Sequence, residues 1–144
     1  MICSCGSLTI SSFTVSSSDD SSSSGSGVFV VVGSSGNILR STDNGVNWDN
    51  ATDPTNSNIW GIGFGNNTFV GFCHNGLIVR STDNGSSFSY ATENTSVHLL
   101  DVTFGNNTFV GGGYSGTILR STDNGTTWDI VNSGTGQQLW GAGF

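Results

Sequence analysis

The chain has 144 residues and a formal net charge of −7, from ten acidic and three basic side chains, so it is acidic and long enough for one buried core. The three basic residues are all arginine, and because nucleic acids and anionic membranes require basic patches, neither is expected as a partner. With 22 glycines, a single proline and many serine, threonine and asparagine residues, the composition disfavours long helices and favours short strands joined by tight turns.

Residues 1–24 are expected to form a flexible serine-rich tail or linker, because "SSSDDSSSSGSG" offers nothing to bury. "LTISSFTV" is apolar enough for an additional strand, which is the alternative. The opening "MICSCGSLTI" lacks the positive charge and sustained apolar run of a signal peptide, and no run approaches the length of a membrane span. The compartment is left unassigned, with an extracellular or virion-associated protein among the options. The odd number of cysteines predicts no disulfide framework.

A string of eight residues then recurs at a fixed interval. "ILRSTDNG" begins at residue 38, "IVRSTDNG" at 78 and "ILRSTDNG" again at 118, a period of 40 residues without insertion or deletion. "FGNNTFVG" likewise begins at 64 and 104, and "WGIGF" at 60 matches "WGAGF" at 140. A period of this size is typical of repeat architectures. We expect units at about 25–59, 60–99 and 100–139, followed by a closing strand at 140–144.

The pattern inside one unit predicts four short strands. In the unit 60–99, the apolar runs "WGIGF", "NTFVGFC", "LIVRS" and "SFSYAT" alternate with "GNN", "HNG" and "TDNG", which carry the residues that tight hairpin turns require. Four antiparallel strands in about forty residues predict one blade of a β-propeller, so the expected fold class is all-β. A single blade cannot cover both of its faces, and we expect its apolar residues to be buried against neighbouring blades.

Each unit contains the spacing Ser-x-Asp-x-Gly-x-x-aromatic, which is expected to close a hairpin. The aspartate can accept backbone N–H groups, the glycine can adopt positive φ, and the aromatic ring can insert between adjacent sheets. The residues with these structural roles are Ser41, Asp43, Gly45, Trp48, Ser81, Asp83, Gly85, Phe88, Ser121, Asp123, Gly125 and Trp128.

This string resembles the Asp-box, or BNR repeat, found in sialidases, sortilin-type receptors, some xyloglucanases and photosystem II assembly factor-like propellers. The surrounding "WGIGFGNNTFVG" is most similar to the last group, and the resemblance extends over about residues 25–144. It implies a propeller in which the Asp-box is a fold element away from any active site. It therefore implies no particular chemistry.

The residues that could carry chemistry do not form a recognisable catalytic set. A sialidase needs three converging arginines, whereas Arg40, Arg80 and Arg120 occupy one equivalent position in three different units. Glu93 is the only glutamate, which gives a glycosidase no clear carboxylate pair. The two histidines lack the spacing of a zinc site. We expect no enzyme activity, no metal and no cofactor.

Binding is the remaining class of function. Trp60 and Trp140 begin the first strand of their units, near one mouth of the central channel, where they could stack on a sugar or grip a peptide; core packing is the alternative. The three arginines could form a basic ring for an acidic peptide, or could pair with the aspartates of neighbouring boxes. The expected function is a non-enzymatic scaffold or protein-binding module, part of a larger assembly such as a virion or a photosystem assembly complex. The alternative is a carbohydrate-binding or glycosidase-derived propeller.

The ends of the chain raise the question of ring closure. The chain holds roughly 3.6 units, whereas propellers usually have four to eight blades. The first unit has serines where the others have their first strand, and "WGAGF" has no strands after it. One hypothesis is a homodimer of six blades in which each "WGAGF" pairs with the "GVFVVVG" strand of the other chain. The other is that the chain is a fragment of a longer propeller.

Overall fold

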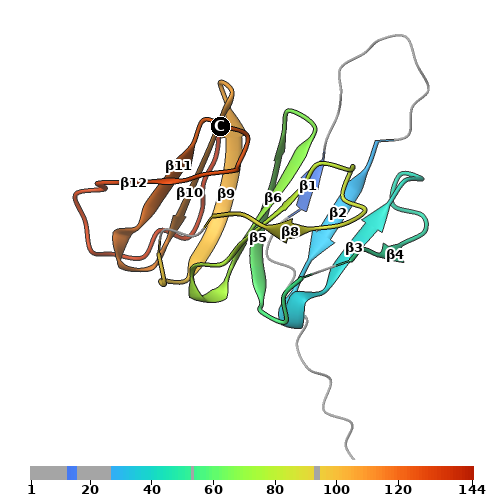
Figure 1. The fold of residues 1–144 in the computed structure, drawn as a ribbon, viewed down its shortest axis with the longest axis horizontal. Coiled ribbons are helices and arrows are strands. Elements are labelled where there is room, and N and C mark those ends of the chain that lie inside the picture. The colour runs from blue at the N-terminus through green and yellow to red at the C-terminus, as the bar shows by residue number, and fades with distance from the viewer. Residues whose placement is uncertain (1–12, 16–26, 53, 93–94) are drawn as a thin grey trace, which may run out of the picture.

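The computed structural model describes residues 13–15, 27–52, 54–92 and 95–144, which form three four-stranded antiparallel sheets (Figure 1). In each sheet, every strand pairs with the next one along the chain, and a short 3-10 turn separates the second strand from the third. The first sheet contains β1 (Phe13–Val15), β2 (Phe29–Val32), η1 (Ser34–Gly36), β3 (Ile38–Ser41) and β4 (Asp49–Asn50). The second contains β5 (Ile59–Gly65), β6 (Thr68–Cys73), η2 (His74–Gly76), β7 (Ile78–Ser81) and β8 (Ser89–Tyr90). The third contains β9 (Leu99–Gly105), β10 (Thr108–Gly113), η3 (Tyr114–Gly116), β11 (Ile118–Ser121) and β12 (Asp129–Val131).

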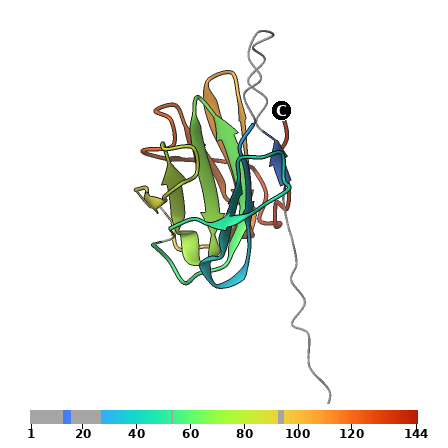
Figure 2. The same cartoon turned by 90° about the vertical axis from the view of Figure 1, so that its right-hand side faces the viewer.

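The three sheets stand side by side in chain order and pack face against face (Figures 1 and 2). Strand β5 contacts β2 of the first sheet and β9 of the third, so the second sheet lies between the other two. The expected all-β architecture of antiparallel sheets is confirmed for the residues that the structure describes. Within that part of the chain, no helix is long or apolar enough to cross a membrane.

The hydrophobic core lies between the sheets. One cluster lies between the first and second sheets, and a second cluster lies between the second and third. The two clusters use equivalent positions of the repeat, and a side chain fully buried in either contributes about 1.5–3 kcal/mol. The first cluster contains Val30, Val32, Ile38, Ile59, Ile62, Phe69, Cys73, Val79 and Phe88. The second contains Val70, Phe72, Ile78, Leu99, Val102, Phe109, Leu119 and Trp128.

The first strands of adjacent sheets approach one another closely, which explains the glycines in "WGIGF". A β-carbon added at Gly61 would lie 2.7 Å from Cα of Asp101, and one added at Gly63 would lie 2.9 Å from the carbonyl oxygen of Val102. Neither position leaves room for a side chain facing the next sheet. The larger residues between these glycines, such as Ile62, supply the apolar packing.

The first sheet obtains its first strand from the segment 1–24. Strand β1 pairs with β2, with Phe13 opposite Val31, Thr14 opposite Val30 and Val15 opposite Phe29. This differs from the expectation of a tail or linker throughout that segment and agrees with the alternative of a strand within "LTISSFTV". The sequence has serines one period before "WGIGF" because the connection between β1 and β2 is longer than the one between β5 and β6. The other residues of 1–24 lie outside those described.

Within this chain, β1 rather than the C-terminal segment 140–144 pairs with β2 of the first sheet. The segment instead lies beside β9, as β9 lies beside β5. The N–H of Ala142 donates to Oδ2 of Asp101 at 2.9 Å. The N–H of Leu139 donates to the carbonyl of Gly113 at 3.0 Å, just as the N–H of Ile59 donates to the carbonyl of Gly33. The segment thus takes the first-strand position of a fourth blade.

Candidate functional site

The three Asp-boxes have one hydrogen-bonding geometry. In the first box, Oδ1 of Asp43 accepts the N–H groups of Val46 at 3.1 Å and Asn47 at 2.9 Å. The Ser41 hydroxyl donates to the same carboxylate oxygen at 2.8 Å and accepts the N–H of Gly45 at 2.9 Å. Equivalent bonds form around Asp83 and Asp123. Each box therefore fixes the turn between the third and fourth strands of its sheet.

These hydrogen bonds favour the charged form of each carboxylate. The backbone N–H of Asn47 is the strongest influence at Asp43, and with the Asn47 amide and Ser41 hydroxyl it lowers the pKa to about 2. At Asp83 and Asp123, desolvation raises the pKa, but hydrogen bonds led by those from Ser87 and Thr127 outweigh it and lower the pKa to about 2. The box aspartates therefore remain ionised and act as hydrogen-bond acceptors within their turns.

The aromatic residue of each box packs against the preceding blade where there is one. Trp128 is 1% exposed, and its ring meets that of Phe72 edge-on at 5.1 Å between centroids. Phe88 is also buried. Trp48, in the first blade, is 37% exposed, because no described strand covers that side. The first blade therefore presents an exposed apolar face that includes Leu39 and Trp48.

The arginines link one blade to the next. Nε of Arg40 donates to the carbonyl of Asn84 at 2.6 Å, and Nε of Arg80 donates to the carbonyl of Asn124 at 2.7 Å. The acceptor is a backbone carbonyl of the neighbouring box, rather than the box aspartate considered from the sequence. Arg120 is exposed and makes no such bond to any described residue.

Trp60 and Trp140 are not adjacent. Trp60 lies in β5, partly buried, whereas Trp140 is 67% exposed in the C-terminal segment, and Leu100 of β9 holds the equivalent position between them.

A row of aromatic rings extends from the second blade to Trp140. The rings of His74 and His98 stack at 3.6 Å between centroids, Tyr114 follows edge-on at 4.9 Å from His98, and Trp140 lies 6.1 Å from Tyr114. Among described residues, no group of three histidine, cysteine, aspartate or glutamate side chains could hold a metal ion.

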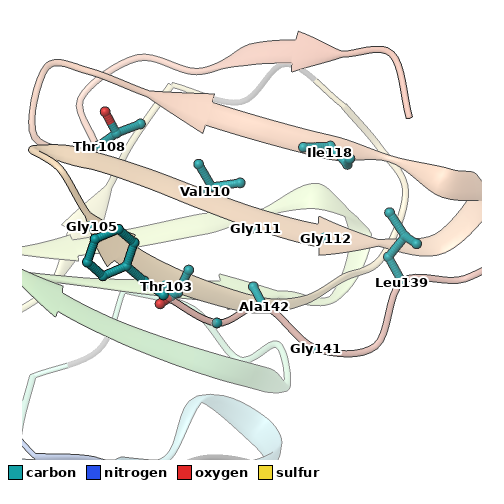
Figure 3. Close-up of a pocket in the computed structure, with 12 residues that line it drawn as sticks. Thr103, Gly105, Thr108, Val110, Gly111, Gly112, Ile118, Leu139, Gly141 and Ala142 are labelled. Atoms are coloured by element: carbon teal, nitrogen blue, oxygen red, sulfur yellow. The ribbon is translucent and has the colours of Figure 1, made fainter. Parts of the chain in front are cut away.

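A cavity of about 360 Å³ opens between the third blade and the C-terminal segment (Figure 3). We call it the C-terminal groove. Val110 of β10 and Ile118 of β11 form one wall, and Leu139 and Ala142 come from the chain opposite (Figure 3). The full lining comprises Thr103, Gly105, Thr108, Val110, Gly111, Gly112, Ile118, Leu139, Gly141, Ala142, Gly143 and Phe144. It contains no charged side chain.

The C-terminal groove occupies the place where the interblade core would continue. Val70 and Ile78, one period before Val110 and Ile118, are fully buried against the third blade. Phe72, one period before Gly112, places its ring in the core between the second and third blades. At Gly112, the equivalent position of the groove, there is no side chain. The wall of the groove therefore corresponds to the side of the second blade that packs against the third blade.

Asp101 is a site residue that the sequence did not reveal. Asp101 is partly buried and accepts the N–H groups of Val102 and Ala142 through its two oxygens. The available signal was that Asp101 stands where the neighbouring units have Gly61 and Gly141. That carboxylate holds the C-terminal segment in place.

Comparison with protein-family models and with curated protein sequences gives no match. Solved structures of similar fold include two of YCF48. The structure of YCF48 bound to D1 peptide aligns with a TM-score of 0.63 at 19% identity, covering 72% of this chain and 35% of that chain. YCF48 from Cyanidioschyzon merolae aligns with a TM-score of 0.63 at 22% identity, covering 75% of this chain and 37% of that chain. This chain thus spans little more than a third of their length, and its sheets have the fold of part of a YCF48 β-propeller.

Proposed function

We propose that the chain is a non-enzymatic β-propeller module that binds an extended segment of a protein partner in the C-terminal groove. The observation that carries the proposal is the groove itself: an apolar, glycine-rich cavity beside a first-strand segment that has no described second strand. The groove offers only the hydroxyls of Thr103 and Thr108 as reactive side chains, which favours binding over catalysis. A propeller of similar fold, YCF48, has been solved with a D1 peptide bound.

The expected mode of binding is the addition of a strand. In the second and third blades, Ile62 pairs with Gly71 and Val102 pairs with Gly111. Ala142 is the next member of this series and has no partner strand among the described residues. A peptide in the groove would bond to the backbone of 141–144 and direct alternate side chains toward Val110 and Ile118. The preferred ligand is an uncharged extended segment with β-branched or aromatic residues at alternate positions.

Selection from a library of displayed peptides tests this proposal. The protein is immobilised sparsely, so that neighbouring copies cannot touch, and bound peptides are tested against Val110→Asp and Val46→Asp. Val110 lines the groove, whereas Val46 is 75% exposed in the first box and provides a matched control. We expect apolar, alternating peptides that bind the wild type and Val46→Asp but lose at least tenfold in affinity for Val110→Asp. No enrichment, or equal binding to both variants, contradicts the proposal.

A carbohydrate-binding surface is a second candidate, favoured by the exposure of Trp140 and its edge-on approach to Tyr114. A glycan array on the wild type, repeated with Trp140→Ala and Trp60→Ala, tests it. Sugar binding that disappears in Trp140→Ala while the fold is retained would support this candidate. An array without binding would exclude the sugars it presents.

A further inference from the structure

We infer that the partner in the C-terminal groove is a second copy of this chain, docked head to tail through the exposed face of its first blade. The inference rests on the proposed function, because it names the partner of the same groove. Two such contacts would close a ring of six blades, three from each copy. The two interblade interfaces within the chain are the templates for this third interface.

The chain carries both halves of its own interblade interface, each without a described partner. One half is the wall of the C-terminal groove, formed by Val110, Gly112 and Ile118. The other half is the exposed face of the first blade. Its members Leu39 and Trp48 are exposed, whereas their equivalents in the second and third blades, Val79, Phe88, Leu119 and Trp128, are buried against the preceding blade. Trp48 would fill the space that Gly112 leaves open.

The residues that make polar contacts across the internal interfaces have equivalents in the third blade that make no such contact with a described residue. Arg80 donates to the carbonyl of Asn124, and the Asn124 amide donates in return to the Thr68 hydroxyl at 2.9 Å. One period later stand Arg120, which is exposed, and Thr108, which lines the groove. In the dimer both would meet Asn44 of the second copy, the equivalent of Asn124.

The surroundings of the glycine in each box indicate the same contact between the box and the preceding blade. A β-carbon at Gly85 would lie 2.7 Å from Cγ2 of Val30, and one at Gly125 would lie 2.6 Å from Cγ2 of Val70. In both cases the valine belongs to the preceding blade. Among the described residues, a β-carbon at Gly45 would meet only its own Trp48 within 4 Å, at 3.7 Å. Val110 of a second copy is the equivalent valine for Gly45.

In the docked dimer, β1 and the C-terminal segment of the other copy would compete for the same edge of β2. Within one chain, β1 pairs with β2 and places Val15 opposite Phe29. The repeat assigns the same edge to the C-terminal segment, because Phe64 lies opposite Phe69 and Phe104 opposite Phe109. Phe144, which is 85% exposed, is the next member of this series. The C-terminal segment of one copy therefore replaces β1 on β2 of the other.

Sedimentation equilibrium tests the inference by mass. We expect the wild type at twice the chain mass of 14.9 kDa. Val110→Asp should be a monomer, whereas the control Val46→Asp should remain a dimer because its equivalents Ser86 and Thr126 stay exposed in the internal interfaces. Arg120→Ala should raise the dissociation constant about tenfold or more. If Val110→Asp does not fold, Arg120→Ala decides, because the Arg120 side chain is exposed.

A cysteine pair tests the register. Phe29→Cys with Phe144→Cys, in a chain with Cys3 and Cys5 changed to serine, should give a disulfide-linked dimer on a non-reducing gel. Val46→Cys with Phe144→Cys should not. A wild-type monomer that still selects groove peptides overturns this inference and leaves the proposed function standing, whereas a monomer that selects none contradicts both. A dimer that persists equally in Val110→Asp also overturns the inference.

Discussion

At the residue scale, the carboxylates of the Asp-boxes make stability depend on pH. The folded pKa of Asp43, Asp83 and Asp123 is about 2, below the ordinary value of 3.8. A depressed pKa contributes stability above the unfolded pKa, and this contribution is lost as pH falls through the folded value. We therefore expect the free energy of unfolding to decrease between about pH 4 and pH 2. Urea titrations of the wild type and Asp123→Asn across this range check the prediction: the variant should be less stable at pH 7 and show a shallower decrease, and equal slopes would contradict it.

The box glycines should differ in their tolerance of alanine. Gly45 and Gly125 both have positive φ, which costs alanine about 1–2 kcal/mol. At Gly125, the added methyl group would also overlap Val70, an overpacking cost of about 1–3 kcal/mol. Gly125→Ala should therefore reduce the free energy of unfolding by clearly more than Gly45→Ala. Chemical denaturation at a protein concentration low enough to keep the chain monomeric measures the difference, and equal losses would show that Gly125 does not pack against the preceding blade.

The hydrogen bonds that a residue makes within its own turn could be predicted from the sequence, whereas the contacts between blades could not. The hydrogen bonds of Asp43 follow from residues three and four positions ahead. The acceptor for Arg40 is a carbonyl 44 residues further along the chain, and its identity depends on how two blades pack. No local pattern contains that information.

At the element scale, one carboxylate holds the C-terminal segment against β9. Replacing Asp101 by alanine removes the acceptor of the Ala142 N–H, so the Ala142 amide should exchange its hydrogen at least tenfold faster. Asp129→Ala, which changes an exposed aspartate of β12, is the matched control and should leave this rate unchanged. Residue-resolved hydrogen exchange gives both rates. An unchanged rate in Asp101→Ala would mean that the segment is held by other contacts.

The strands of the second and third blades follow the sequence pattern closely, whereas the first strand of the first blade does not. Periodicity located the second and third units because their turn residues and apolar runs recur at a constant offset. It missed β1 because the connection from Val15 to Phe29 is longer than the corresponding turns of two residues, at 66–67 and 106–107. A fixed period cannot find a strand whose connection has a different length.

At the scale of the whole molecule, the core belongs to pairs of blades rather than to any one of them. Each internal interface buries residues from both neighbours, so a blade at either end of the array leaves one face uncovered. The apolar residues of that core could be identified from the sequence. The C-terminal groove could not, because it depends on where the C-terminal segment lies and on Gly112 standing where the second blade has Phe72.

The most direct test is hydrogen exchange at Gly141 and Gly143. The Ala142 N–H points to Asp101. Because successive N–H groups in an extended segment alternate in direction, we expect those of Gly141 and Gly143 to point toward the place of a second strand. If the groove receives a strand from a second copy, both amides exchange slowly in the concentrated wild type and rapidly in Val110→Asp. Rapid exchange at both positions in both proteins would contradict the account.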